Sequence, residues 1–287
     1  MSPAEVLAFE ARWRTRAAIG SAAGALLVLG GGIGLVTTLS SSKTDELTSQ
    51  LLFYDHHSSS LLLATIVAGL GSVCMIAPLV FLFRATQARR PQLPGVALIT
   101  AVVGPIAAGL GQIALQIVLL NKAHTFATTG AQTYAEAKHL TDAGILKAMQ
   151  GLVLAGQLSL GFAFVLISLN AMRVGLLTRF MGVLGIIVGV LFVIPLGTLQ
   201  VVQPFWLLTL TALFLGRWPN GVPPAWQTGK AEPWPSQQQL REEREKTKAA
   251  QLRAAGEGEP EPEPAAVTAS ETPAHPSSKK RKRKRKR

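Results

Sequence analysis

Long apolar segments without a charged residue are the feature that most constrains the fold of this chain. A helix rises about 1.5 Å per residue and the hydrocarbon layer of a membrane is about 30 Å thick, so one crossing needs about 20 such residues. Lipid offers no partner to backbone polar groups, and these segments lack the alternating pattern of a membrane β-barrel strand. We therefore predict an all-α integral membrane protein. The segments that contain no Asp, Glu, Lys or Arg are residues 17–39, 61–83, 95–120, 150–172 and 180–197.

A sixth span over residues 199–216 completes a predicted six-helix transmembrane bundle at 17–216, although this segment contains Gln200, Gln203 and Pro204. Positive charges gather on the cytoplasmic side of membrane proteins, so their positions predict the orientation. Nine arginines that flank the spans on one side place both the N-terminus and the C-terminus in the cytoplasm, which requires an even number of spans. The arginines are Arg12, Arg14, Arg16, Arg84, Arg89, Arg90, Arg173, Arg179 and Arg217; the lysines on the external side are Lys43, Lys122, Lys138 and Lys147.

Residues 1–16 are expected to form a cytoplasmic interfacial helix that leads into the first span. Ser2 and Glu5 have the spacing of a capping box, and Pro3 occupies the first helical position, where proline is favoured. Three apolar residues share one face at helical spacing, as in helices that lie in the membrane interface. They are Val6, Phe9 and Trp13.

The composition changes beyond residue 216, and residues 217–235 combine three tryptophans with five prolines. Proline stiffens such a segment, and tryptophan favours the headgroup zone, so we expect a ribbon along the cytoplasmic membrane face. A docking motif for a proline-recognition domain is the alternative. Residues 236–255 are predicted to form a polar helix capped by Ser236.

Residues 256–287 are rich in glycine, proline, glutamate, alanine and serine and are predicted to be a disordered tail. Nine of the 28 basic residues end this tail, and removing them leaves 19 against 16 acidic residues, so the net charge of +12 reflects the tail more than a basic domain. The cluster is expected to contact anionic lipid or an acidic partner, and nucleic acid or ribosome contact stays open as a nonspecific alternative. Its members are Lys279, Lys280, Arg281, Lys282, Arg283, Lys284, Arg285, Lys286 and Arg287.

Glycines four residues apart predict close approach between membrane helices. Such pairs are Gly20 with Gly24, Gly30 with Gly34, and Gly185 with Gly189. Two of the apolar segments also carry amides, which in lipid need hydrogen-bond partners, so we expect the third and fourth spans to face each other and bond through them. A substrate path lined by the same side chains is the alternative. The amides are Gln112, Gln116, Gln157 and Asn170.

Four histidines map to the external connections, with Asp55 and Asp142 beside them. A zinc or copper site needs three or four converging ligands, and adjacent histidines plus scattered ones lack that spacing, so no metal site is predicted and ordinary polar loop residues are preferred to a metal or pH-sensing site. The histidines are His56, His57, His124 and His139. The single cysteine, Cys74, is expected to be a small packing residue.

No segment predicted to span the membrane carries an ionisable group at depth, which disfavours proton-coupled pumps, intramembrane proteases, haem carriers and voltage sensors. We expect no cofactor and no enzymatic activity. The leading hypothesis is a structural or regulatory membrane component with a polybasic cytoplasmic tail. The alternative is a carrier or channel-like protein for an uncharged or amphiphilic solute.

The run from Thr178 to Gly182 opens a glycine-rich span, and the run from Gly216 to Pro219 closes the apolar region. With these runs, residues 173–235 resemble uncharacterised multi-pass membrane proteins of actinobacteria. The resemblance implies the inner membrane of a bacterium and supplies no activity.

Overall fold

A computed structural model describes residues 2–40, 46–194, 201–218, 221–232, 241–242 and 245–251, and these residues form helices without a β-strand. The chain divides into two units, Met1–Trp234 and Pro235–Arg287. In the second unit, residues 241–242 and 245–251 are helical and fall within the polar helix predicted at 236–255. The predicted tail and its polybasic cluster lie outside the described residues.

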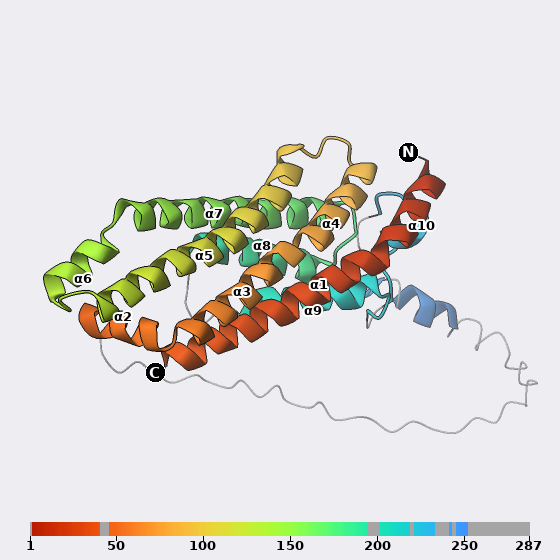
Figure 1. Cartoon of the computed structure of the whole chain (residues 1–287). Helices are drawn as coiled ribbons and strands as arrows, with labels where there is room; N and C mark the ends of the chain where they lie inside the picture. Colours follow the sequence, from red (N-terminus) through yellow and green to blue (C-terminus); the bar gives the residue numbers. More distant parts are fainter. Residues whose placement is uncertain are drawn as a thin grey trace, which may run out of the picture. The chain divides into compact units, whose positions relative to one another are not determined.

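Four apolar stretches of the first unit are long enough to cross a membrane. They are α1, the pair α3 and α4 taken together (Ser58–Arg89), α5 and α7, whereas α8 and α9 are shorter. The helices are α1 (Pro3–Leu39), α2 (Leu47–His56), α3 (Ser58–Cys74), α4 (Ile76–Arg89), α5 (Val96–Thr128), α6 (Tyr134–Thr141), α7 (Gly144–Arg173), α8 (Arg179–Val193), α9 (Val202–Phe214) and α10 (Ala225–Thr228). The protein is thus an all-helical bundle with four candidate membrane spans (Figure 1).

Neighbouring helices run in alternating directions across the bundle. Helix α1 packs on α3, α4 and α9; α3 packs on α5; α5 packs on α7; and α7 packs on α8. The N-terminus of α1, the end of α4 and α10 lie at one end of the bundle, while α2 and α6 lie at the other (Figure 1). This arrangement gathers segments that are far apart in the sequence at each end.

Helix α1 continues without a break from Pro3 to Leu39, so the predicted interfacial helix and the first span are one helix. The predicted capping box is confirmed: the Glu5 N–H donates to Ser2 Oγ at 3.3 Å, and the Ser2 N–H donates to Glu5 Oε2 at 2.7 Å. At about 1.5 Å per residue such a helix extends roughly 55 Å, well beyond the hydrocarbon layer. Its first turns therefore lie outside the apolar segment that begins at residue 17.

The predicted second span is interrupted at Met75, where α3 ends and α4 begins. Pro78 lies three residues later and has no N–H to donate to the carbonyl of Cys74, so the regular hydrogen-bond ladder is broken there. Met75 instead donates its N–H to the Ser72 carbonyl at 3.1 Å, which is a tighter turn. The two helices remain one apolar stretch of 32 residues.

Glycines bring the backbones of adjacent helices together. A Cβ at Gly31 would lie 2.5 Å from the Ala68 nitrogen, and one at Gly104 would lie 2.6 Å from the Leu160 nitrogen. Gly161 and Gly189 meet in the same way, each Cβ position falling 2.6 Å from the carbonyl oxygen of the other. The interfaces α1 with α3, α5 with α7, and α7 with α8 therefore depend on residues without a side chain.

The structure bears out two of the three predicted glycine pairs. Gly20 and Gly24 face α3 and α4, and Gly185 and Gly189 face α7. In the third pair Gly34 approaches Ala64, but Gly30 has no neighbour within 4 Å. The prediction is wrong for Gly30, and Gly31 makes the close contact instead.

The neighbouring glycines of α1 give a matched test of this packing. We expect Gly31→Ala to lower the free energy of unfolding by about 1–3 kcal/mol, because the new methyl group is forced against the backbone of α3. Gly30→Ala adds the same atom in open space, so its higher helix propensity should raise stability by up to about 1 kcal/mol. Thermal unfolding of the purified proteins in detergent measures both. Equal effects of the same sign would contradict this packing of α1 on α3.

Candidate functional site

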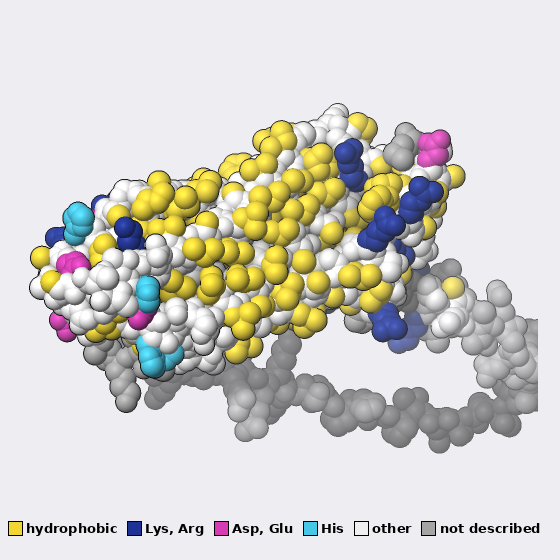
Figure 2. Space-filling view, viewed as in Figure 1, with side chains coloured by type: hydrophobic (Ala, Val, Ile, Leu, Met, Phe, Trp, Pro, Cys, Tyr) yellow, Lys and Arg dark blue, Asp and Glu magenta, His cyan; other side chains and the backbone are white. Residues whose placement is uncertain are grey.

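Charged side chains separate to the two ends of the bundle. Figure 2 shows most Lys and Arg at the end that carries the N-terminus, whereas the opposite end carries histidines, most acidic side chains and some Lys or Arg, with a hydrophobic band between the two ends. In a membrane this pattern places the two charged ends in the headgroup regions. The arginine-rich end, which we call the basic end, contains the most elaborate polar contacts of the described residues.

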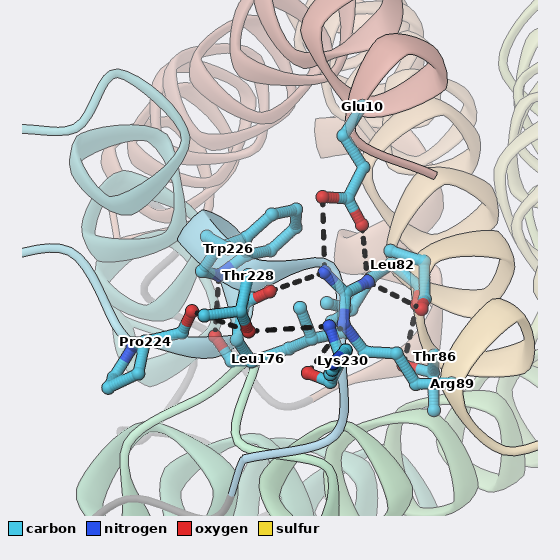
Figure 3. Close-up of polar contacts among 11 residues, drawn as sticks. Glu10, Leu82, Thr86, Arg89, Leu176, Pro224, Trp226, Thr228 and Lys230 are labelled. Carbon is cyan, nitrogen blue, oxygen red and sulfur yellow. Dashed lines mark hydrogen bonds and ion pairs between the residues drawn. The ribbon is translucent and has the colours of Figure 1, made fainter. Parts of the chain in front are cut away.

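A buried ion pair joins α1 to the last turn of α4 at the basic end. Arg89 donates through Nη1 to Glu10 Oε1 and through Nη2 to Glu10 Oε2, the latter at 3.2 Å (Figure 3). The two side chains are 0% and 4% exposed. Taking two charges out of water is costly, and a bidentate arginine–carboxylate pair is the geometry that offsets that cost best.

The remaining donors of Arg89 bind backbone carbonyls (Figure 3). Nη2 donates to the Ala225 oxygen at 2.5 Å, Nη1 to the Ala85 oxygen at 3.0 Å, and Nε to the Lys230 oxygen at 3.3 Å. A guanidinium has five N–H groups, and all five are used here. Arg89 therefore holds together α1, α4 and the segment around α10.

Trp226 in α10 fills the space beside this ion pair. It is 7% exposed, its ring stacks on Phe81 with ring centres 5.7 Å apart, and its indole N–H donates to the Leu176 carbonyl at 2.9 Å. The guanidinium of Arg89 lies 5.8 Å from the centre of the ring. An indole is well placed where it can pack an apolar body and also satisfy its N–H.

The described part of residues 217–235, for which a ribbon along the membrane face is predicted, packs into the basic end of the bundle. Ala225 is fully buried, and the Glu232 N–H donates to the Val174 carbonyl at 3.2 Å, so the segment is bound into the end of the bundle. Proline and tryptophan content indicated an interfacial position, but it could not show that open carbonyls after α7 were within reach of Trp226. The remaining members of the segment, at 219–220 and 233–235, lie outside the described residues.

Arg14 caps the C-terminal end of α9. Its Nε donates to the Phe214 carbonyl and its Nη2 to the Leu213 carbonyl, the latter at 3.3 Å. The last carbonyls of a helix lack partners within the helix and carry partial negative charge, which a cation stabilises. Helix α9 is also tied to α1 deeper in the bundle, where Ser21 Oγ donates to the Leu207 carbonyl at 2.8 Å.

A groove of about 720 Å³ lies beside the ion pair, between α1 and α4. Its walls are mainly apolar, and two arginines line it together with one glutamine. Arg16 lies with its guanidinium carbon 4.8 Å from the centre of the Trp13 ring. The lining includes Val6, Phe9, Trp13, Ile76, Val80 and Phe81, with Arg16, Arg84 and Gln87.

The predicted intramembrane amides are not joined to one another. Helices α5 and α7 do pack together, but among the described residues no hydrogen bond links Gln112 or Gln116 to Gln157 or Asn170. Asn170 donates instead to the Leu166 carbonyl of its own helix at 2.8 Å. The contact of α5 with α7 rests on Gly104 and on Gly156, which meets the backbone of Ala107 and Ala108.

The external histidines do not converge. His124 pairs with Asp55, its Nδ1 lying 2.9 Å from Oδ1, but the two side chains are 66% and 28% exposed, a geometry of little energetic value. The His57 ring stacks on Phe53 with centres 4.2 Å apart, and His56 lies beside it with centres 5.0 Å apart. His139 lies on α6. Within the described ranges, no three His, Cys, Asp or Glu side chains are placed to hold a metal ion.

The ion pair at the basic end generates a prediction for stability. Arg89→Leu should lower the free energy of unfolding by about 3–5 kcal/mol, since it leaves the Glu10 carboxylate buried without a partner. The double variant Glu10→Leu with Arg89→Leu should lose about 0.5–3 kcal/mol less than the sum of the single variants. Arg89→Leu should also speed cleavage by trypsin after Lys230, because its carbonyl loses a donor.

Arg173→Leu is the control, because this arginine also ends a helix but is exposed. Thermal unfolding in detergent measures the stability of the two single variants, the double variant and the Arg173→Leu control. Limited trypsin digestion in detergent measures how fast each is cleaved. A loss with Arg173→Leu as large as that with Arg89→Leu would show that the charge matters and the buried contacts do not.

Comparison with known protein families, with curated proteins and with solved structures gives no match. Any function must therefore be argued from this chain's own residues. The contacts at the basic end are structural, since each buried donor and acceptor of Arg89 and Glu10 is used within the protein. The groove beside them combines available cations, Arg16 and Arg84, with an apolar surface.

Proposed function

We propose that this chain is a six-span protein of the bacterial plasma membrane, with both termini in the cytoplasm, and that it acts as a non-enzymatic structural or regulatory component. The observation that carries the proposal is the charge separation in Figure 2, with a hydrophobic band between a basic end and a mixed-charge end. Arginines near the ends of spans favour the cytoplasmic side. The basic end holds the N-terminus of α1 and the segment after α9, so the proposal places both on the same side of the membrane.

Helices α8 and α9 supply the fifth and sixth spans in this proposal. They have 15 and 13 residues, so each extends only about 20 Å, and a short span is accommodated by local thinning of the bilayer. The outward face of α8 is apolar at helical spacing, as a lipid-facing surface requires. The exposed hydrophobic residues of α8 are Phe180, Val183, Ile187, Val190 and Val193. Trp206 of α9 faces inward and donates its indole N–H to the Met181 carbonyl at 3.0 Å.

The interior supports a packed scaffold better than a solute path. Between α5 and α7, Gly104 and Gly156 bring backbone against backbone. A carrier for an uncharged solute would need space between these helices, lined by Gln112, Gln116, Gln157 and Asn170. Close backbone contact at Gly104 and Gly156 leaves little room between the two helices for such a path.

The polybasic cluster at residues 279–287 is proposed to contact anionic lipid headgroups of the inner leaflet or an acidic partner. A basic residue near an anionic surface contributes about 1 kcal/mol, so nine can hold the tail at the membrane. The hydrogen bond from Glu232 to Val174 anchors the chain at the basic end just before the second unit begins. The charge of the tail and the charge of the bundle would then act on the same leaflet.

Cysteine labelling in intact cells tests the topology. After Cys74→Ser, an impermeant thiol reagent should label Gln132→Cys, between α5 and α6, and Thr198→Cys, between α8 and α9. It should leave Gln92→Cys, between α4 and α5, and Gln227→Cys, in α10, unlabelled until the membrane is opened. Protection of Thr198→Cys with labelling of Gln132→Cys would reduce the span count to four. Labelling of Gln92→Cys in intact cells would reverse the orientation.

A further inference from the structure

The groove between α1 and α4 combines an apolar surface with two unpaired cations. Arg16 and Arg84 are both exposed, and the three ion pairs of the described residues involve other side chains. Glu10, the acid of α1 closest to Arg16 in the sequence, already has both oxygens held by Arg89. The groove therefore carries two positive charges that no carboxylate of the described chain balances.

The two arginines mark the same depth in the membrane. Arg16 is the last charged residue before the uncharged segment 17–39, and Arg84 is the first charged residue after the uncharged segment 61–83. Because α1 and α4 pack against each other in opposite directions, these two boundaries meet at the groove. The cations lie at headgroup level, and the apolar wall formed by Ile76 and Val80 continues from them toward the hydrocarbon layer.

Each wall of the groove fits one part of an amphiphile. A guanidinium binds a phosphate group through paired hydrogen bonds, and Trp13 stacks against Arg16 at the rim, which limits the positions that this side chain adopts. The volume of about 720 Å³ is in the range of sites that enclose a molecule or a large part of one. A small anion bound to the arginines would not cover the apolar wall of the groove.

We propose that this groove is a binding site for one anionic phospholipid, with the phosphate between Arg16 and Arg84 and an acyl chain along Ile76, Ala77 and Val80. The inference rests on the membrane placement proposed above. The bound lipid adds a specific contact at the basic end, independent of the polybasic tail. The groove is also lined by Phe81, whose ring stacks on Trp226, so a bound lipid supports the packing around the Glu10–Arg89 ion pair.

Native mass spectrometry of the purified full-length chain in a nonionic detergent tests this site. Phosphatidylglycerol is compared with phosphatidylcholine of the same acyl chains, and with glycerophosphoglycerol, which has the headgroup and no chains. We expect one phosphatidylglycerol retained per chain, weaker retention of phosphatidylcholine, and none of the soluble headgroup. Arg16→Gln with Arg84→Gln should weaken retention of phosphatidylglycerol about 10-fold or more, as expected for the loss of hydrogen bonds between charged groups.

Matched variants separate the groove from charge and hydrophobicity in general. Arg12→Gln with Arg179→Gln removes the same charge from exposed positions outside the groove and should leave retention unchanged. Val80→Trp should fill the groove and abolish retention, whereas Val103→Trp adds the same ring to an exposed position of α5 and should not. A chain truncated after Ser278 should keep its lipid. Thermal unfolding of each variant without added lipid shows that the fold is retained.

Several outcomes would overturn the proposal. Equal loss with Arg12→Gln and Arg179→Gln would reduce the effect to net charge, and equal retention of phosphatidylcholine would reduce it to an apolar surface. If the protein retained glycerophosphoglycerol, the groove would be a phosphate-binding site that does not require acyl chains. Loss of lipid on truncation after Ser278 would assign binding to the tail. If Val80→Trp fails to fold, the arginine pairs still decide the question. The cysteine labelling reports on topology separately, so a failure of lipid binding leaves that proposal standing.

Discussion

The basic end of the bundle depends on the buried guanidinium of Arg89. A buried arginine is tolerated only when its N–H donors are satisfied. The five acceptor atoms that Arg89 binds belong to α1, to its own helix α4 and to the segment around α10. None of these elements can satisfy Arg89 alone. Closure of this end is therefore expected to be cooperative, with α1, α4 and residues 225–232 taking their places together. Trp226 completes the closure, since it covers the ion pair and bonds to the connection after α7.

The all-helical fold with its long apolar helices was predictable because lipid imposes a constraint that is visible along the sequence. An uncharged stretch of sufficient length rarely occurs outside a bilayer, and the capping box at Ser2 and Glu5 is a local pattern that needs no knowledge of the rest of the chain. The contact of Glu10 with Arg89 joins residues 79 positions apart. In the sequence both residues look like ordinary charges near the end of a span, and nothing local indicates that each is buried by the other. The contacts of Trp226 with Phe81 and Leu176 are likewise invisible in the local sequence.

The rotation of a helix about its own axis is a second property that the spacing of residues in the sequence does not determine. The run Gly30 to Gly34 predicts that α1 approaches a neighbour closely, but adjacent residues point about 100° apart on a helix, so the facing helix decides which glycine makes the contact. That helix is α3, and it selects Gly31. The amides illustrate the same limit. Asn170 reaches the carbonyl four residues before it, so it needs no partner on α5, just as hydroxyl side chains do in membrane helices.

The arginines of the basic end divide into two kinds that the sequence does not distinguish. Arg14 donates to backbone carbonyls, and Arg89 donates to backbone carbonyls and to the Glu10 carboxylate. Arg16 and Arg84 instead line an apolar groove, and their donors are not used within the described part of the protein. The charge rule that predicts orientation counts both kinds alike, because it acts on charges near the ends of spans whatever contacts they make in the folded protein. Binding, in contrast, can use only the second kind. A count of flanking arginines therefore supports the proposed topology, but the location of a lipid site follows only from knowing which of them the fold has left unpaired.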